Sequence, residues 1–168
     1  MNLLLNHIKH LRFLSVIAII GKKVKYIPFL PVILDEIIKS FTFLFYPNKF
    51  VAMKALITRT IKETNAETIY HRFGGIEFHC DKKEIAHLHS NGLLDINFPK
   101  RITTTLIKQK WCSPHHIHPD TGWISFYIKS DKDLNKGIQL IKWSKEIKTG
   151  MKMMDCLEKE MNHSKDVI

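Results

Sequence analysis

The alternation of apolar and polar residues between Ile76 and Phe98 constrains the fold more than any other feature of this 168-residue chain. Apolar side chains recur at every second position in three short runs, and two loops, Asp81-Lys82-Lys83 and Ser90-Asn91-Gly92, separate the runs. A period of two is typical of a strand that buries one face only. The segment is therefore predicted to fold as a three-stranded antiparallel meander.

The loop lengths fix the register of this meander. With three residues in each loop, Phe78 lies opposite Ala86 and Leu88 lies opposite Leu94, all on the buried face. The polar face then carries a row of three ionisable residues with three polar neighbours: Glu77, His87 and Asp95, flanked by His79, His89 and Asn97. An imidazole between two carboxylates has its charged form favoured and its orientation fixed. We predict that His87 lies between Glu77 and Asp95.

Helical patterns surround the meander. Apolar residues recur at helical spacing from residue 48 to about 64, Pro99 suits the first turn of a helix that runs to about residue 111, and a further helix is predicted over 132–148. A final strand is predicted over 123–128, with Trp123 as a core aromatic rather than a platform for a substrate. This order indicates an α+β fold, in which helices pack on one face of an antiparallel sheet of about four strands.

The first third of the chain is both apolar and basic. Apolar runs cover 13–20, 26–34 and 41–47, and residues 1–62 hold ten Lys or Arg against two acidic residues. No run reaches the roughly 18 uncharged residues of a membrane-spanning helix, whereas a basic apolar segment suits an anionic membrane surface. We predict one or two helices on the cytoplasmic face of a membrane, in a peripheral or monotopic arrangement. The alternative is a helical cap on the folded domain.

These patterns divide the chain into a hydrophobic, basic, helical segment over 1–50, a folded domain over 51–150, and a tail over 151–168. Residues 63–168 are nearly neutral, with sixteen basic against fourteen acidic residues. A nucleic-acid partner is not expected there, because phosphate binding requires a basic stripe on the binding domain. Three cysteines without a C-x-x-C pair indicate a reducing compartment and no disulfide framework.

Histidine is concentrated in the folded domain. Seven of the ten histidines lie between His71 and Phe126, and histidine is both a group that titrates near neutral pH and the commonest metal ligand. The candidate catalytic residues are His87, Glu77, Asp95, His89, His115 and His116. The candidate metal ligands are His87, His89, His115 and His118.

Five ordered blocks of sequence form a recognisable pattern in this domain. They are Arg72-Phe73-Gly74-Gly75-Ile76-Glu77-Phe78, Glu84-Ile85-Ala86-His87-Leu88-His89, Gly92-Leu93-Leu94-Asp95-Ile96-Asn97-Phe98-Pro99, Pro114-His115-His116 and Pro119-Asp120-Thr121-Gly122-Trp123-Ile124-Ser125-Phe126. Over about residues 65–148, the pattern resembles the luciferase-domain family, whose bacterial members resemble fungal luciferase. The resemblance implies an oxygen-using oxidoreductase: fungal luciferase oxidises a hydroxylated pyrone with molecular oxygen to a high-energy peroxide, and it carries an N-terminal hydrophobic membrane segment.

Three interpretations of the histidines remain open. In the first, an oxygenase that requires no cofactor uses His87 to remove a proton from a small enol or phenolic substrate. In the second, His87 and His89 join a loop histidine and a carboxylate to hold a single divalent metal, iron or zinc. In the third, water satisfies a polar sheet face and a His-rich loop. A competing function is a non-catalytic module that holds a small apolar ligand at the membrane.

Overall fold

The computed structural model describes residues 30–72 and 74–150. The predicted run 13–20, the first part of the run 26–34 and the predicted tail 151–168 lie outside the described residues. The elements in chain order are α2 (Leu30–Phe45), α3 (Pro47–Thr64), β1 (Glu67–Tyr70), β2 (Ile76–Cys80), β3 (Lys83–Leu88), β4 (Leu93–Asn97), α4 (Lys100–Lys108), β5 (Ser113–Pro114), β6 (Trp123–Tyr127), the 3-10 helix η1 (Asp131–Asp133) and α5 (Leu134–Lys148).

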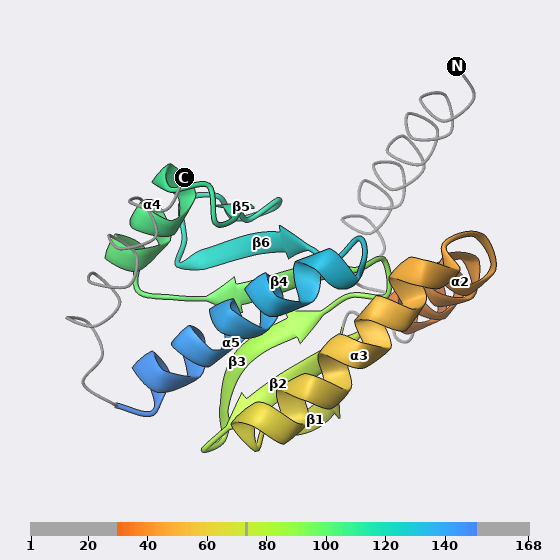
Figure 1. The fold of residues 1–168 in the computed structure, drawn as a ribbon, viewed down its shortest axis with the longest axis horizontal. Coiled ribbons are helices and arrows are strands. Elements are labelled where there is room, and N and C mark those ends of the chain that lie inside the picture. Colours follow the sequence, from red (N-terminus) through yellow and green to blue (C-terminus); the bar gives the residue numbers. More distant parts are fainter. Residues whose placement is uncertain (1–29, 73, 151–168) are drawn as a thin grey trace.

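The six strands form one antiparallel sheet in the order β1-β2-β3-β4-β6-β5 (Figure 1). The α+β prediction is confirmed, although the sequence predicts about four strands. The two additional strands lie at the edges of the sheet. All four side chains of β1 are exposed, so the strand shows no alternation, and β5 has only two residues. Neither strand therefore carries a pattern that predicts it.

The predicted register of the meander is confirmed. Phe78 pairs with Ala86 and Leu88 pairs with Leu94. The first loop nevertheless has two residues rather than three: Asp81 and Lys82 both have positive φ, 51° and 61°, as a two-residue hairpin turn of the I′ type requires. The register shifts after Phe78, because a β-bulge in β3 leaves Ile85 without a partner on β2. The bulge restores the register that a three-residue loop would have given.

Helices α3 and α5 lie over one face of the sheet (Figure 1). The core fills the space between them, where Leu56 of α3 and Leu140 of α5 are buried together with Phe78, Leu94 and Ile124 of the sheet. Each such side chain contributes about 1.5–3 kcal/mol relative to an exposed position. The prediction that helices pack on one sheet face is confirmed, and the row of Glu77, His87 and Asp95 points away from the helices.

Helix α2 is attached to the sheet through polar side chains. Its buried residues are Asp35 and Thr42. The Asp35 carboxylate accepts hydrogen bonds from Ser90 Oγ at 2.6 Å and from the backbone N–H of Gly75 at 2.8 Å, and Thr42 Oγ1 donates to the carbonyl of Ser90 at 3.0 Å. Gly75 has a φ of 86°, and a Cβ there would lie 2.3 Å from the carbonyl oxygen of Leu88. The loop can therefore approach β3 and α2 only because it carries no side chain at this position.

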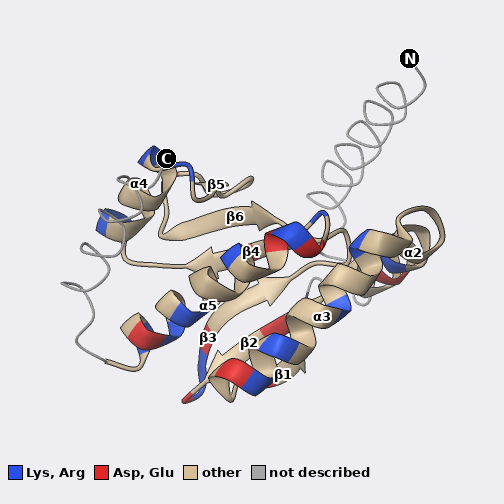
Figure 2. Ribbon diagram, in the orientation of Figure 1, with Lys and Arg blue, Asp and Glu red and all other residues tan. Residues whose placement is uncertain are grey.

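The charged residues of the described chain are distributed without a single basic stripe. Figure 2 shows acidic and basic residues together on α3 and on α5. Within residues 30–72 and 74–150, no helix is long and apolar enough to cross a membrane.

Candidate active site

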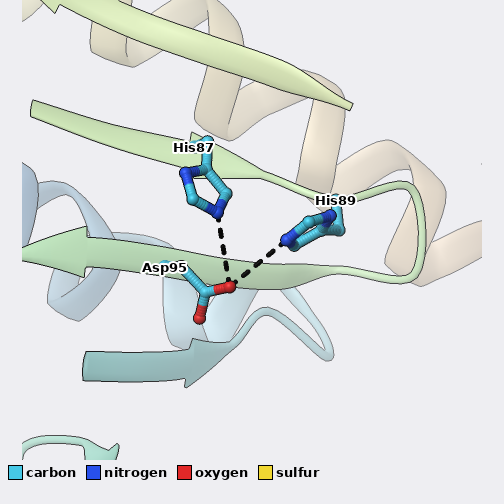
Figure 3. Close-up of side chains that lie close together, drawn as sticks. All are labelled: His87, His89 and Asp95. Atoms are coloured by element: carbon cyan, nitrogen blue, oxygen red, sulfur yellow. Dashed lines mark hydrogen bonds and ion pairs between the residues drawn. The ribbon is translucent and has the colours of Figure 1, made fainter. Parts of the chain in front are cut away.

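The candidate site is centred on Asp95, whose side chain is completely buried on β4. Four imidazole nitrogens surround its Oδ2 atom: His89 Nε2 at 3.2 Å, His87 Nε2 at 3.4 Å, His115 Nε2 at 3.5 Å and His116 Nδ1 at 3.8 Å. The other carboxylate oxygen, Oδ1, accepts a hydrogen bond from Ser125 Oγ at 2.5 Å. Figure 3 shows His87 and His89 converging on one oxygen of Asp95. We call Asp95, these four histidines, Ser125 and Glu84 the Asp95 cluster.

The pairing of the strands assembles this cluster. Asp95 lies opposite His87 on β3 and opposite Ser125 on β6, so the three side chains share one face of the sheet. His89 follows His87 by two residues and therefore projects from the same face. On the far side, Ser113 of β5 pairs with Ser125, and this pairing brings the next residues of the loop, His115 and His116, over Asp95.

The charge of Asp95 is maintained by its neighbours. Burial alone would raise the pKa of Asp95, but hydrogen bonds from His115, His87 and His89 outweigh burial and hold the pKa far below its usual value. A buried carboxylate without partners would instead become neutral. The cluster therefore keeps a negative charge in a site from which water is largely excluded.

His87 lies between two carboxylates, as the sequence predicts, but the second carboxylate is Glu84 rather than Glu77. Its Nδ1 is 2.5 Å from Glu84 Oε1. Burial lowers the pKa of His87, but Asp95 and Glu84 outweigh burial and raise it to about 9. In the metal-free protein His87 is thus an imidazolium at neutral pH. A metal ion bound at Nε2 would take the place of its second proton.

Glu77 lies opposite His87 in the sheet, yet its carboxylate turns away to other histidines. Glu77 Oε2 is 2.6 Å from His79 Nε2, and Oε1 is 3.8 Å from His71 Nε2. His71 was not among the predicted site residues. It stacks on His87, with ring centroids 4.5 Å apart and planes 19° from parallel. The density of histidine was the only sequence signal for His71, since it stands outside the alternating runs.

Two further imidazoles at the site are neutral at pH 7. Burial lowers the pKa of His71 to about 4, with coulombic repulsion from His87 and His89 as the next causes. Burial likewise lowers the pKa of His116 to about 4, although Asp95 opposes the shift. His116 is more than a third exposed and lies at the open edge of the cluster.

His115 and His118 differ in their relation to Asp95. Two backbone N–H groups, of Ile117 and His118, donate to His115 Nδ1 at 3.2 and 3.0 Å. Because Nδ1 accepts hydrogen bonds, the proton of His115 is on Nε2, which points at Asp95. The exposed His118 stacks on His115, with ring centroids 5.5 Å apart. Among the described residues, His118 belongs to neither group whose ligand atoms could hold a metal ion.

Two overlapping groups of described residues could hold a metal ion: His87, His89 and Asp95, and Asp95, His115 and His116. Within each group the potential ligand atoms lie within 4.8 Å of one another. The first group fits an ion better, because the lone pair of His115 Nδ1 is already occupied by two N–H donors and its Nε2 carries the proton.

The prediction that Trp123 is a core aromatic is wrong. Trp123 is absent from the hydrophobic core and lies on the site face of the sheet. Its ring is 5.1 Å from that of His87 and 6.2 Å from that of His115, and it is partly exposed. A partly exposed aromatic ring beside the cluster provides a surface on which a planar ligand can stack.

The fold and the site define a class of protein: a small α+β domain with a buried carboxylate among histidines on the sheet face opposite its helices. Residues 82–144 match the family model described as Luciferase domain, which confirms the resemblance seen in the sequence. The matched segment contains every member of the Asp95 cluster, whereas His71 and Glu77 lie before it. No curated protein and no solved structure matches the chain.

Proposed function

We propose that the protein catalyses an oxygen-dependent oxidation of a small enol or phenolic compound at the Asp95 cluster, on a membrane surface. The observation that carries the proposal is a fully buried Asp95 contacted by imidazoles from β3 and from the loop after β5, beside a partly exposed Trp123. The luciferase-domain match supports an oxidoreductase role. Perturbed ionisable groups gathered on one face are typical of functional sites.

Next to the carboxylates of the cluster, the protonated His87 is the group that can stabilise an anionic form of the substrate. An enol or phenol that loses its hydroxyl proton carries a negative charge. Positive charge is present at His87 Nε2, because this nitrogen holds either a proton or a metal ion that replaces the proton. The ring carbon of such an anion can give two electrons to oxygen, so that a C–O bond forms and protonation yields a peroxide. A protonated His87 cannot take the substrate proton, so we assign His87 to stabilising the anion instead of acting as the general base. The hydroxyl proton passes instead to the neutral His116 at the edge of the cluster, and it can return to the peroxide oxygen.

Trp123 and the neutral histidines complete the proposed substrate site. A planar aromatic substrate would stack on Trp123, with its oxygen toward the cluster. His116, neutral and partly exposed at the edge, is the imidazole that such a substrate would meet first.

Oxygen consumption with a panel of small enols and phenols tests the proposal. We expect Asp95→Asn to reduce oxygen uptake at least about 100-fold, the range in which loss of a positioned polar catalytic group falls. The matched control is Asp120→Asn, which removes an exposed carboxylate from the loop before β6 and should leave uptake unchanged. Uptake by Asp95→Asn at the wild-type rate would contradict the proposal. Ligand retention without oxygen uptake would favour a non-catalytic binding module.

A second observation supports the membrane part of the proposal. The buried residues of helix α2, Asp35 and Thr42, are polar, and six of its apolar residues are exposed, the reverse of an ordinary surface helix. The exposed side chains, between 39% and 67% accessible, are Val32, Ile33, Ile37, Phe43, Leu44 and Phe45. The residues before α2 are strongly basic, including Lys22, Lys23 and Lys25. An apolar helix face that follows basic residues in the sequence suits an anionic bilayer.

Vesicle binding tests this part separately. We expect the variant Leu44→Asp to bind phosphatidylserine-containing vesicles roughly tenfold or more weakly, because burial of a leucine contributes about 1.5–3 kcal/mol and 1.4 kcal/mol corresponds to a factor of ten. The control is Ile69→Asp, which changes a half-exposed apolar residue on β1, away from α2. Equal weakening by both variants would contradict a specific role for α2.

A further inference from the structure

We infer that His87 Nε2, His89 Nε2 and Asp95 Oδ2 form a mononuclear site for a divalent metal ion of the iron class. The choice of iron rests on the proposed oxygen-dependent function, whereas the binding of a metal does not. Three features of the structure carry the inference: the distances from Asp95 Oδ2 to the two ligand nitrogens, the partners that orient His87 and Asp95, and the ligand positions that the other histidines leave unfilled.

The spacing of the ligand atoms matches a single ion. Metal bonds of about 2.0–2.2 Å to nitrogen and oxygen place neighbouring ligand atoms about 3.0 Å apart at right angles and about 3.4 Å apart at the tetrahedral angle. Asp95 Oδ2 is 3.2 Å from His89 Nε2 and 3.4 Å from His87 Nε2. Both distances from Asp95 Oδ2 therefore match those of one ion, and all three ligand atoms lie within 4.8 Å of one another. Figure 3 shows both rings directed at the same oxygen.

Two of the three ligands, His87 and Asp95, each have a hydrogen-bond partner that fixes their orientation. Glu84 Oε1 lies 2.5 Å from His87 Nδ1, which places a proton on Nδ1 and directs the Nε2 lone pair at the site. Ser125 Oγ donates to Asp95 Oδ1 and leaves Oδ2 for the ion. Carboxylate–histidine pairs of this kind usually orient metal-bound imidazoles. Glu84 occupies this place because the bulge at Ile85 turns it to the site face.

The remaining histidines do not complete the coordination of an ion held by this group. The proton on His115 Nε2 prevents that nitrogen from binding an ion, and His116 Nδ1 is farther from Asp95 Oδ2, at 3.8 Å. Two histidines and one carboxylate with open positions are typical of non-haem iron(II) sites that use oxygen. Such an ion would supply positions for oxygen and for the substrate oxygen side by side.

Anaerobic titration of the full-length protein with Co²⁺, followed by its visible d–d absorption, tests the inference. We expect one equivalent to bind to the wild type, and His89→Ala and Asp95→Asn to weaken binding at least about 100-fold. Glu84→Gln should weaken it about 10–100-fold and shift the absorption bands, because an outer partner is changed and no ligand is lost. The control His118→Ala should bind as the wild type does. His115→Ala should still bind one equivalent.

Because His89 is only partly buried, at 22% exposure of its side chain, its loss should disturb the fold least, and His89→Ala is the decisive variant. Urea unfolding checks that this variant is folded. The absence of Co²⁺ binding to the wild type, or equal binding by wild type and folded His89→Ala, would overturn the inference. Oxygen uptake with and without added iron(II) separates it from the proposed function. Metal binding without oxygen uptake with any substrate would support the metal site and count against the proposed oxidation. Oxygen uptake that persists after chelation, with no metal bound, would support the oxidation and overturn the metal site.

Discussion

Removal of the Asp35 side chain should detach α2 from the sheet. The structure gives this carboxylate two short hydrogen bonds, from Ser90 Oγ at 2.6 Å and Gly75 N at 2.8 Å, and a longer one from Ser90 N at 3.3 Å. A hydrogen bond to a charged group contributes about 1.5–3 kcal/mol. Counting the two short bonds only, we expect Asp35→Ala to lower the free energy of unfolding by about 3–6 kcal/mol, a large fraction of the about 5–15 kcal/mol typical of a domain.

Urea unfolding followed by tryptophan fluorescence measures this change, since Trp111, Trp123 and Trp143 all lie in the folded domain. Asp35→Asn keeps an acceptor oxygen and should cost about half as much. The control is Glu36→Ala on the same helix, whose exposed ion pair with Lys39 contributes less than about 1 kcal/mol. A cost below about 1 kcal/mol for Asp35→Ala, or one equal to that of Glu36→Ala, would refute the polar attachment of α2.

Three other predictions follow from single positions. Gly75→Ala should lower the free energy of unfolding by more than about 2 kcal/mol, because a Cβ would lie 2.3 Å from Leu88 O. Gly150→Ala, with a similar φ of 80° and no atom within 4 Å of the added Cβ, should lower it by only about 1 kcal/mol. Urea unfolding compares the two variants. Burial raises the pKa of Cys112 to about 12, so about one thiol in 10⁴ is ionised at pH 8, and peptide mapping after iodoacetamide should find Cys112 unmodified in native protein and modified in urea. Ser125→Ala should lower oxygen uptake less than Asp95→Asn does, because it frees one Asp95 oxygen but keeps the charge; a larger loss would contradict its orienting role.

Much of the site could be predicted from the sequence because a sheet converts a pattern of period two into spatial neighbours. The register that places His87 beside Asp95 follows from the apolar residues that must face the core. The partner of His87 could not be predicted in the same way. In a regular strand Glu84 would share a face with Ala86, and only the bulge at Ile85 moves it to the side of His87.

Contacts between segments far apart in the sequence account for the other differences. His71 reaches His87 from the loop before β2, and no periodic pattern relates the two positions. Trp123 is the first residue of its strand, directly after Gly122, and the sequence does not indicate which face of the sheet its side chain occupies. Its pairing with Asn97 places it on the site face. The apolar run over 41–47 indicates a buried or membrane-bound segment, but only the bonds of Asp35 reveal which side of α2 faces the sheet.

Elemental analysis of the purified full-length protein, after incubation with iron(II) under nitrogen and desalting, tests the central claim most directly: that the Asp95 cluster is one functional centre. The wild type, His87→Ala and His115→Ala would be measured side by side. We predict close to one iron per chain in the wild type and in His115→Ala, and very little in His87→Ala, since His87 is one of the three proposed ligands and His115 is not. Iron absent from the wild type, or lost equally from both variants, would contradict the assignment of the cluster as a metal centre held by His87, His89 and Asp95.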